Sequence, residues 1–239
     1  MDLVDKVAIV TGSGRGIGKA IALALARQGA RVVVCARTLA EVNAAAGEIE
    51  TLGRTALAVR ADISREADVS TLVSQTIRQF GTIDILVNNA GVGSFAPVAD
   101  LSVSEFDTMW GVNMRGVFLC TKAVLPHMVA RNSGDIINIS SLAGRNAFVG
   151  GAAYCSTKWG LIGFARCVML EVRAHNIRVI TICPGSVDTG FGGKSEADPR
   201  SAGEIPSAED VAGVVADTLR APRHVMVSEV DIRPTNPKH

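Results

Sequence analysis

The chain has 239 residues, 48% of them hydrophobic and 24 of them glycine, a length and composition that suit one α/β domain over residues 1–239. Its 24 Lys and Arg nearly balance its 23 Asp and Glu, which argues against long-range attraction of nucleic acid or of an anionic membrane surface. Asp2 and Asp5 stand where a signal peptide needs basic residues, and no apolar run is long enough to span a membrane, so we expect a soluble, cytoplasmic protein.

Short β-rich segments alternate with helical segments along the whole chain. The strands are predicted at 6–10, 31–36, 55–61, 83–89, 134–140, 177–184 and 224–232, and the helices at 17–28, 39–52, 66–80, 104–131, 154–174 and 208–220. Such alternation indicates βαβ units, whose right-handed crossovers make the sheet parallel. We therefore predict an α/β fold with a doubly wound, seven-stranded parallel sheet and helices on both faces.

A glycine-rich turn, TGSGRGIG, follows the first predicted strand and opens directly into a helix. Glycines let the backbone turn sharply and approach a pyrophosphate, whose charge the helix amino terminus stabilises. Strand, turn and helix in this order are typical of a Rossmann fold that binds a dinucleotide, although a turn that binds nothing is the alternative. The predicted cofactor contacts in this turn are Gly12, Ser13, Arg15, Gly16, Ile17 and Gly18.

The end of the second strand bears on the choice between NAD and NADP. An NAD site usually places an acidic residue there, but this chain has Ala36 followed by Arg37. Arg37 and Arg15 could converge on a 2′-phosphate through charge-assisted hydrogen bonds. We therefore predict NADP(H) as the cofactor, with two solvated surface arginines as the alternative interpretation.

Further cofactor contacts are predicted where the third and fourth strands end. Carboxyl ends of parallel strands line the crevice in which a dinucleotide lies. Asp62 is suited to the adenine amino group, and for Asn89 and Gly91 a purely structural role in the turn is an equal alternative. The residues predicted at this edge are Asp62, Ile63, Asn89, Ala90 and Gly91.

Tyr154, the chain's one tyrosine, precedes Lys158 by four residues and therefore shares a helix face with it. A nearby ammonium stabilises a phenolate, so we expect Lys158 to bring the pKa of Tyr154 toward the working pH and make it a general acid/base. Ser141 follows the fifth strand and could donate a hydrogen bond to a substrate oxygen. Asn113 is expected in the middle of a helix, where it either holds a water or lies on the helix surface.

The motifs TGSGRGIG, NNAG, Asn113, ISS, YCSTK and Pro184-Gly185 occur in an order that resembles the short-chain dehydrogenase/reductase family, from Lys6 to the end of the chain. This resemblance favours Ser141 over Ser140 and implies a catalytic tetrad of Asn113, Ser141, Tyr154 and Lys158. It implies that Lys158 also binds the nicotinamide ribose and that Val187 and Thr189 bind the carboxamide, beside Pro184 and Gly185.

The resemblance also bears on assembly. In the family, helices that correspond to 104–131 and 154–174 form a four-helix contact between subunits. It therefore implies a homodimer or homotetramer of this chain. No binding to nucleic acid or to a membrane is expected, and the histidines and cysteines lack the spacing of a metal site.

The substrate wall is predicted at 92–95 and 142–149 and around Phe191, mostly apolar, with Arg145 and Asn146 as polar exceptions. Phe95 and Phe191, with Ser141 and Tyr154, are the predicted substrate contacts. The polar, glycine-rich segment 189–206 is predicted to be a mobile substrate loop. We expect a small carbonyl or alcohol substrate, which leaves a ketone, an aldehyde, a hydroxy acid and an acyl thioester as alternatives.

We therefore predict an NADP(H)-dependent oxidoreductase that interconverts a carbonyl and a secondary alcohol. The central motifs also resemble 3-oxoacyl-carrier-protein reductases, but the carboxyl-terminal VSEVDIRPTNPKH lacks their usual glycine pair. That sequence is more similar to NADP-dependent alcohol and 3-hydroxy acid dehydrogenases. A third hypothesis is an NADP-binding regulator or scaffold without turnover, since a fold alone does not establish activity.

Overall fold

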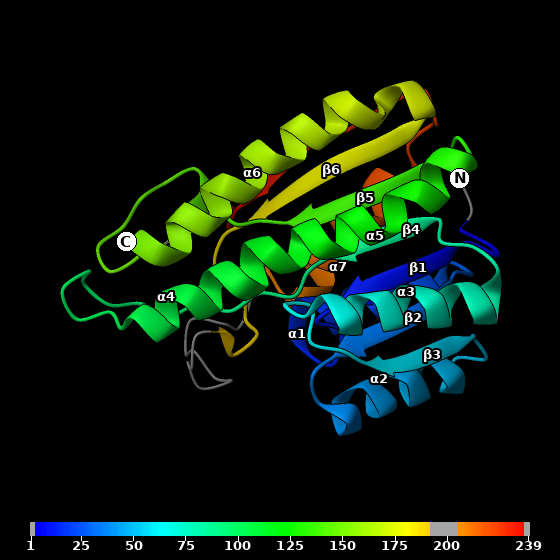
Figure 1. The fold of residues 1–239 in the computed structure, drawn as a ribbon, viewed down its shortest axis with the longest axis horizontal. Coiled ribbons are helices and arrows are strands. Elements are labelled where there is room, and N and C mark those ends of the chain that lie inside the picture. The colour runs from blue at the N-terminus through cyan, green and yellow to red at the C-terminus, as the bar shows by residue number, and fades with distance from the viewer. Residues whose placement is uncertain (1–2, 192–204, 237–239) are drawn as a thin grey trace.

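The computed structural model describes residues 3–191 and 205–236, in which strands and helices alternate as the sequence predicts (Figure 1). The strands are β1 (Val7–Thr11), β2 (Arg31–Ala36), β3 (Ala56–Arg60), β4 (Ile85–Asn88), β5 (Gly134–Ile139), β6 (Ile177–Pro184) and β7 (Glu229–Ile232). The α-helices are α1 (Gly16–Arg27), α2 (Leu39–Thr51), α3 (Glu66–Phe80), α4 (Val103–Trp110), α5 (Val117–Ala130), α6 (Ala152–Val172) and α7 (Ala208–Arg220).

The strands form one sheet in the order β3-β2-β1-β4-β5-β6-β7, and every pairing is parallel. The prediction of a doubly wound, seven-stranded Rossmann fold is therefore confirmed. The strand order reverses between β1 and β4, and in such sheets the ligand crevice opens beyond the carboxyl ends of the strands at this point.

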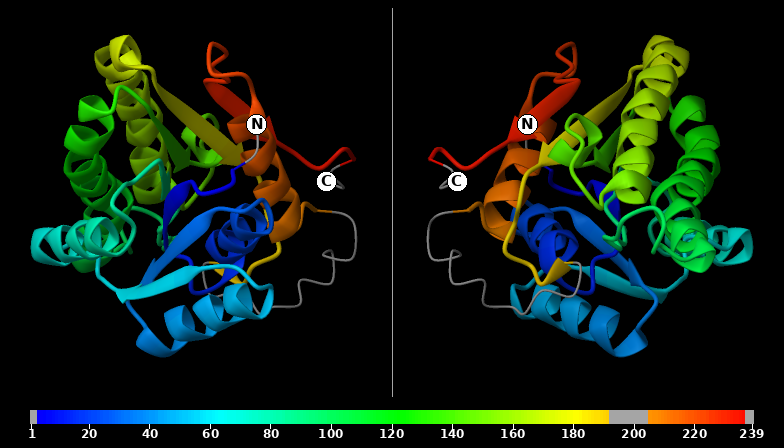
Figure 2. Two further views of the ribbon diagram at one scale, coloured as in Figure 1. Left: turned by 90° about the vertical axis from the view of Figure 1, so that its right-hand side faces the viewer. Right: turned by 90° about the vertical axis from the view of Figure 1, so that its left-hand side faces the viewer.

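Helices cover both faces of the sheet (Figure 2). Successive strand side chains point to opposite faces, so Val10 and Val32 pack under α1, α2 and α7, whereas Ile9 and Val33 pack under α3, α5 and α6. Both clusters consist almost entirely of Val, Ile, Leu and Ala, as expected for strands buried on both faces.

The predicted helix 104–131 is not one continuous α-helix. Between α4 and α5, residues Gly111–Gly116 form a π-helical turn. A π turn accommodates one extra residue in a helix, which changes the direction in which the neighbouring side chains point. Asn113 lies in this turn and is buried, so its placement on the helix surface is wrong.

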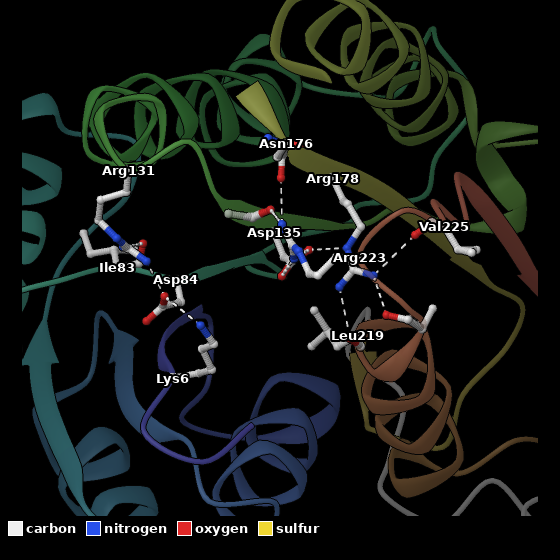
Figure 3. Close-up of polar contacts among 12 residues, drawn as sticks. Lys6, Ile83, Asp84, Arg131, Asp135, Asn176, Arg178, Leu219, Arg223 and Val225 are labelled. Carbon is white, nitrogen blue, oxygen red and sulfur yellow. Dashed lines mark hydrogen bonds and ion pairs between the residues drawn. The ribbon is translucent and has the colours of Figure 1, made fainter. Parts of the chain in front are cut away.

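Strand β7 is shorter than the predicted strand 224–232, because it begins only at Glu229. The residues before it bind charged side chains at the amino-terminal edge of the sheet. Arg223 donates to both carboxylate oxygens of Asp135 (2.9 and 2.7 Å), and Arg178 donates to the carbonyl of Val225 at 3.4 Å (Figure 3). Besides these contacts, the carbonyl of Ser228 accepts from the N–H of Thr181 in β6 at 2.9 Å.

Within residues 3–191 and 205–236, no helix combines the length and apolarity needed to cross a bilayer. Over the same ranges, no cluster of three or more His, Cys, Asp or Glu side chains could hold a metal ion. All five cysteines are free thiols, and four of them are buried.

Candidate active site

A cavity of about 1200 Å³ opens at the carboxyl edge of the sheet, where the segments that follow β1 to β6 converge. The wall contains every predicted catalytic residue, cofactor contact and substrate contact except Ser13 and Asn113. These residues are Gly12, Arg15, Gly16, Ile17, Gly18, Arg37, Asp62, Ile63, Asn89, Ala90, Gly91, Phe95, Ser141, Tyr154, Lys158, Pro184, Gly185, Val187, Thr189 and Phe191.

The glycine-rich turn leaves the amino terminus of α1 open to this cavity. Gly12 has a φ of +65°, and a Cβ atom at Gly18 would lie 2.3 Å from the carbonyl oxygen of Gly12. Larger residues are therefore excluded at both positions. No side chain caps α1, and its first turn has no acidic residue. The free backbone N–H groups and the positive helix end fit a pyrophosphate.

Hydrogen bonds fix the shape of this turn. The Asn89 amide donates to the carbonyl oxygens of Thr11 (2.9 Å) and Gly12 (3.2 Å). Ser13 is buried, where its hydroxyl donates to the carbonyl of Val10 and accepts from the N–H of Cys35. Asn89 thus has a structural role in the turn, and the Ser13 side chain lies outside the cavity wall.

The cavity end nearest β2 carries two guanidinium groups. Arg15 and Arg37 are both exposed, and neither forms an ion pair with another residue of the described part of the chain. Glu41 of α2 also lines this end, with its Cβ only 2.8 Å from where a Cβ of Gly14 would lie. Two positive charges against one negative charge give this end a basic character suited to a phosphate group.

Asp62 lies on the cavity wall beyond β3, and its own turn holds its carboxylate. One oxygen, Oδ1, accepts from the hydroxyl (2.7 Å) and the N–H (3.0 Å) of Ser64. The Asp62 N–H donates to the carboxylate of Asp68. The position agrees with the predicted adenine contact, which itself stays a prediction.

Tyr154 lies in the first turn of α6, and its ring is buried. This burial raises the pKa of Tyr154 to about 12, and a hydrogen bond with Ser141 only partly offsets the increase. The pKa thus lies above that of a free phenol, opposite to the shift expected from Lys158, whose ammonium lies 5.7 Å from the centre of the ring. Tyr154 is therefore a protonated phenol at neutral pH, which suits proton donation.

Lys158 is buried one helical turn further along α6, and its Nζ donates to the carbonyl of Ile139 at 2.9 Å. Burial lowers the pKa of Lys158 to about 8. A buried amine, a phenol and a serine hydroxyl thus lie on the wall of one cavity.

The lowered pKa predicts a pH-dependent stability. Above about pH 8 the folded chain has released the Lys158 proton, whereas the unfolded chain keeps it up to about pH 10.5. The free energy of unfolding should therefore rise with pH through this window, by about 1 kcal/mol between pH 7 and 9. Urea unfolding of wild type and Lys158→Met at both pH values isolates this contribution. A difference between the two proteins that does not change with pH would contradict the lowered pKa.

The two neighbouring serines after β5 have different partners. Ser140 is buried and donates to the carbonyl of Lys158 at 3.2 Å, so it supports the α6 backbone. Ser141 is hydrogen-bonded to Tyr154, donates to the carbonyl of Pro184 at 3.3 Å and accepts from the N–H of Ala143. Of the two hydroxyls, that of Ser141 is the one shared with the phenol.

Asn113 connects the segments on either side of the site. Its Oδ1 accepts from the N–H of Val92 at 2.9 Å, and its amide donates to the carbonyl of Val92 and the hydroxyl of Thr157. It therefore positions the segment after β4 against α6 rather than lining the cavity. The π-helical turn aims this side chain inward, which simple helical periodicity does not predict.

Arg145 is not part of the substrate wall, contrary to the sequence-based expectation. It is turned toward β7, where it forms ion pairs with Glu229 (2.6 Å) and Asp231 (2.7 Å).

The predicted loop 189–206 falls mostly on residues 192–204, outside the described residues. The sequence analysis did not predict that Glu41 and Asp188 lie on the wall. Glu41 could have been predicted, because it comes shortly after β2 and therefore lies near the carboxyl edge of the sheet.

Comparison with known proteins places this site in a family. A family model described as short chain dehydrogenase matches residues 6–200. The chain is 35% identical over 237 residues to a sepiapterin reductase of Chlorobaculum tepidum, with 96% of each chain covered. It is 39% identical over 198 residues to a 3-oxoacyl-[acyl-carrier-protein] reductase of Synechocystis sp., covering 82% of this chain and 80% of the relative.

A solved structure extends the likeness over nearly the whole chain. An alcohol dehydrogenase from the archaeon Thermococcus sibiricus, complexed with 5-hydroxy-NADP, superposes with a TM-score of 0.91 and 32% identity and covers 98% of this chain and 99% of its own. Family match, fold and site agree: the chain is an oxidoreductase that acts on a carbonyl or an alcohol, and it belongs to the short-chain dehydrogenase family.

Proposed function

We propose that this protein reduces a ketone or aldehyde with NADPH and catalyses the reverse oxidation with NADP⁺. The observation that carries the proposal is the arrangement of one cavity. Its wall holds the buried phenol of Tyr154, the Ser141 hydroxyl and the Lys158 amine, together with the glycine-rich turn and the two arginines. The bound 5-hydroxy-NADP of the archaeal alcohol dehydrogenase supports the cofactor assignment.

In the proposed reduction, Ser141 and Tyr154 donate hydrogen bonds to the carbonyl oxygen of the substrate. The bound nicotinamide supplies the hydride that reaches the carbonyl carbon. Tyr154 gives its phenolic proton to the oxygen as negative charge develops there, and Ser141 stabilises that charge. Lys158 binds the nicotinamide ribose and provides a positive charge next to the phenolate that Tyr154 becomes. Asn113 positions the segment after β4 and, through Thr157, helix α6.

The remaining cavity residues are each assigned to one part of the cofactor. Backbone N–H groups at Gly16, Ile17 and Gly18 bind the pyrophosphate, and Arg15 and Arg37 bind the 2′-phosphate. Asp62 and Ile63 would hold the adenine, and the turn of Asn89, Ala90 and Gly91 would hold the ribose. Pro184, Gly185, Val187 and Thr189 contact the nicotinamide carboxamide. These roles follow from the family resemblance and are supported by the position of each residue on the cavity wall.

The cofactor assignment predicts a switch of specificity. A double variant, Ala36→Asp with Arg37→Leu, is expected to lower the NADPH/NADH ratio of kcat/KM about 100-fold. The new carboxylate repels a 2′-phosphate and accepts from a 2′-hydroxyl, while one guanidinium is lost. Steady-state kinetics with both cofactors measure the ratio. Arg54→Leu, at an exposed arginine that does not line the cavity, serves as the control. An unchanged ratio in the double variant would show that these positions do not select the cofactor.

Turnover itself is tested by following NADPH absorbance with a panel of ketones, 3-oxo acids and a 3-oxoacyl thioester, alongside a direct measurement of NADPH binding. Oxidation of NADPH with at least one ketone is the expected result. A rate confined to the thioester would favour the second candidate, a 3-oxoacyl-carrier-protein reductase, which the Synechocystis relative supports. NADPH binding without oxidation by any substrate would leave only a catalytically silent NADP-binding protein.

Assembly into a homodimer or homotetramer is part of the proposal. Exposed aromatic side chains gather on the helices that the family uses between subunits: Phe106 and Trp110 on α4, Phe118 on α5 and Trp159 on α6. Sedimentation velocity is expected to give a mass two or four times 24.9 kDa, and Phe118→Glu is expected to shift it toward the monomer. Leu52→Glu, at another exposed apolar residue, should leave the mass unchanged. A wild-type monomer at micromolar concentration would exclude this assembly.

Localisation in the cytoplasm and a single domain over the whole chain stay predictions.

A further inference from the structure

Three phenylalanines form a group of aromatic rings beside Tyr154 on the cavity wall. The ring centre of Phe95 lies 5.4 Å from that of Tyr154, and the ring centre of Phe191 lies 5.8 Å from it. Phe148 extends the group, with its ring centre 5.8 Å from that of Phe95. All three remain 42–48% exposed and line the cavity, so their faces are available to a bound molecule.

The backbone is built to hold these rings in place. A Cβ atom at Gly93 would lie 2.9 Å from Cε1 of Phe191 and 3.0 Å from Cζ of Phe95, so only glycine lets both rings approach this point. The neighbouring Ser94 hydroxyl donates to the carboxylate of Glu105 on α4 at 2.7 Å. Phe95 therefore follows a residue that is hydrogen-bonded to helix α4.

The charges of the described residues around this group do not favour an anionic substrate. Arg145, the one cation expected there from the sequence, pairs with Glu229 and Asp231 instead. Within the described residues, the cations of the wall are Lys158 at the reaction centre and the two arginines beside β2. Asp188 adds a negative charge to the wall beyond β6. A carboxylate or phosphate on the substrate would therefore meet no partner charge among the described residues of this group.

We propose that Phe95, Phe148 and Phe191 form a subsite for the aromatic ring of an uncharged ketone, whose carbonyl group then lies against Tyr154. Phenyl rings pack edge-to-face or offset against other rings at the separations found here, which gives an aromatic group an advantage over a saturated ring of similar size. The inference rests on the proposed function, because it names the substrate class of the same reaction.

The test compares ketones that differ only at the ring. In 4-phenyl-2-butanone and 4-cyclohexyl-2-butanone the carbonyl is insulated from the ring, so its intrinsic reactivity is matched. With NADPH, kcat/KM for the phenyl compound is expected to be at least about fivefold higher. A carboxylate on the phenyl ring is expected to lower kcat/KM at least about tenfold, because the anion has no counter-charge.

Variants assign the preference to the three rings. Phe95→Leu, Phe148→Leu and Phe191→Leu, each made separately, should move the phenyl/cyclohexyl ratio toward one. Phe80→Leu, at the last residue of α3 and off the cavity wall, should leave the ratio unchanged. Calorimetric dissociation constants of both ketones with the NADP⁺-bound protein should show the same order without turnover.

The outcomes separate two failures. Reduction of both ketones with equal efficiency, or a phenyl preference that survives all three substitutions, would overturn the aromatic subsite and leave the proposed function standing. A lack of reduction of any ketone would overturn the proposed function and this inference together. Preferred reduction of the carboxylated ketone would likewise contradict the uncharged substrate class.

Discussion

Replacing Tyr154 with phenylalanine is expected to lower kcat for NADPH-dependent ketone reduction by about 10²- to 10⁴-fold, the usual contribution of a general acid. The substitution removes the one phenol that is hydrogen-bonded to Ser141 and leaves the ring in contact with Phe95 and Phe191. Packing around α6 should therefore persist. Steady-state kinetics at pH 7 provide the rate, and a binding titration should show an unchanged dissociation constant for NADPH.

A matched control for this variant lies in the same helical turn. Ser156→Ala also removes one hydroxyl from α6, but that hydroxyl donates only to the carbonyl of Ala153 at 2.7 Å. Its kcat should stay within about twofold of wild type, since no reacting group is touched. Retention of most of the activity by Tyr154→Phe would show that the proton comes from another group.

Asp135→Ala is expected to cost about 3–5 kcal/mol of folding stability, because it leaves a buried guanidinium without its counter-ion. Asp135 lies at the start of β5 and accepts from Arg178 at 2.6 Å and from Arg223 at 2.7 Å (Figure 3). The Arg178 side chain is only 5% exposed, so water cannot replace the lost carboxylate. Its remaining bonds go to backbone carbonyls, among them that of Leu219 at the end of α7.

Denaturant unfolding of wild type and variant measures this cost. Glu48→Ala, which breaks the partly exposed pair between Lys19 and Glu48, should cost less than about 1 kcal/mol and serves as the comparison. Because Asp135 lies at the edge of the sheet opposite the cavity, kcat/KM should be unchanged while the variant is folded. A cost for Asp135→Ala no larger than that for Glu48→Ala would show that this pair does not stabilise the sheet.

Much of the fold could be predicted from the sequence because its signals are local. Runs such as RVVVCA and IRVITICP alternate with helical segments, and this alternation is enough to specify a parallel sheet. The predictions failed where tertiary contacts override local preference. In the π-helical turn at Gly111–Gly116, Asn113 is hydrogen-bonded to Val92 and Thr157, which are distant in the sequence. Before the late start of β7, Arg223 binds Asp135, which is also distant.

The candidate site shows the same division. The motifs identified Tyr154, Lys158 and Ser141, and the structure brings all three to one cavity. The pKa of Tyr154 could not be predicted in the same way, because burial by the surrounding side chains outweighs the hydrogen bond with Ser141. Arg145 was misplaced because its partners, Glu229 and Asp231, lie more than 80 positions away. Short sequence motifs are thus enough to identify the catalytic groups, whereas the pKa values and ion pairs of these groups depend on residues that are distant in the sequence.

Direct hydride transfer is the central claim, and isotope transfer tests it most directly. NADPH that carries deuterium at the transferable C4 position is incubated with the enzyme and 4-phenyl-2-butanone, and the alcohol is analysed by mass spectrometry and NMR. The account predicts one deuterium on the carbinol carbon for each NADPH consumed, with the hydroxyl proton drawn from the protein and solvent. An alcohol without deuterium at that carbon, or NADPH that is bound but never consumed, would contradict it.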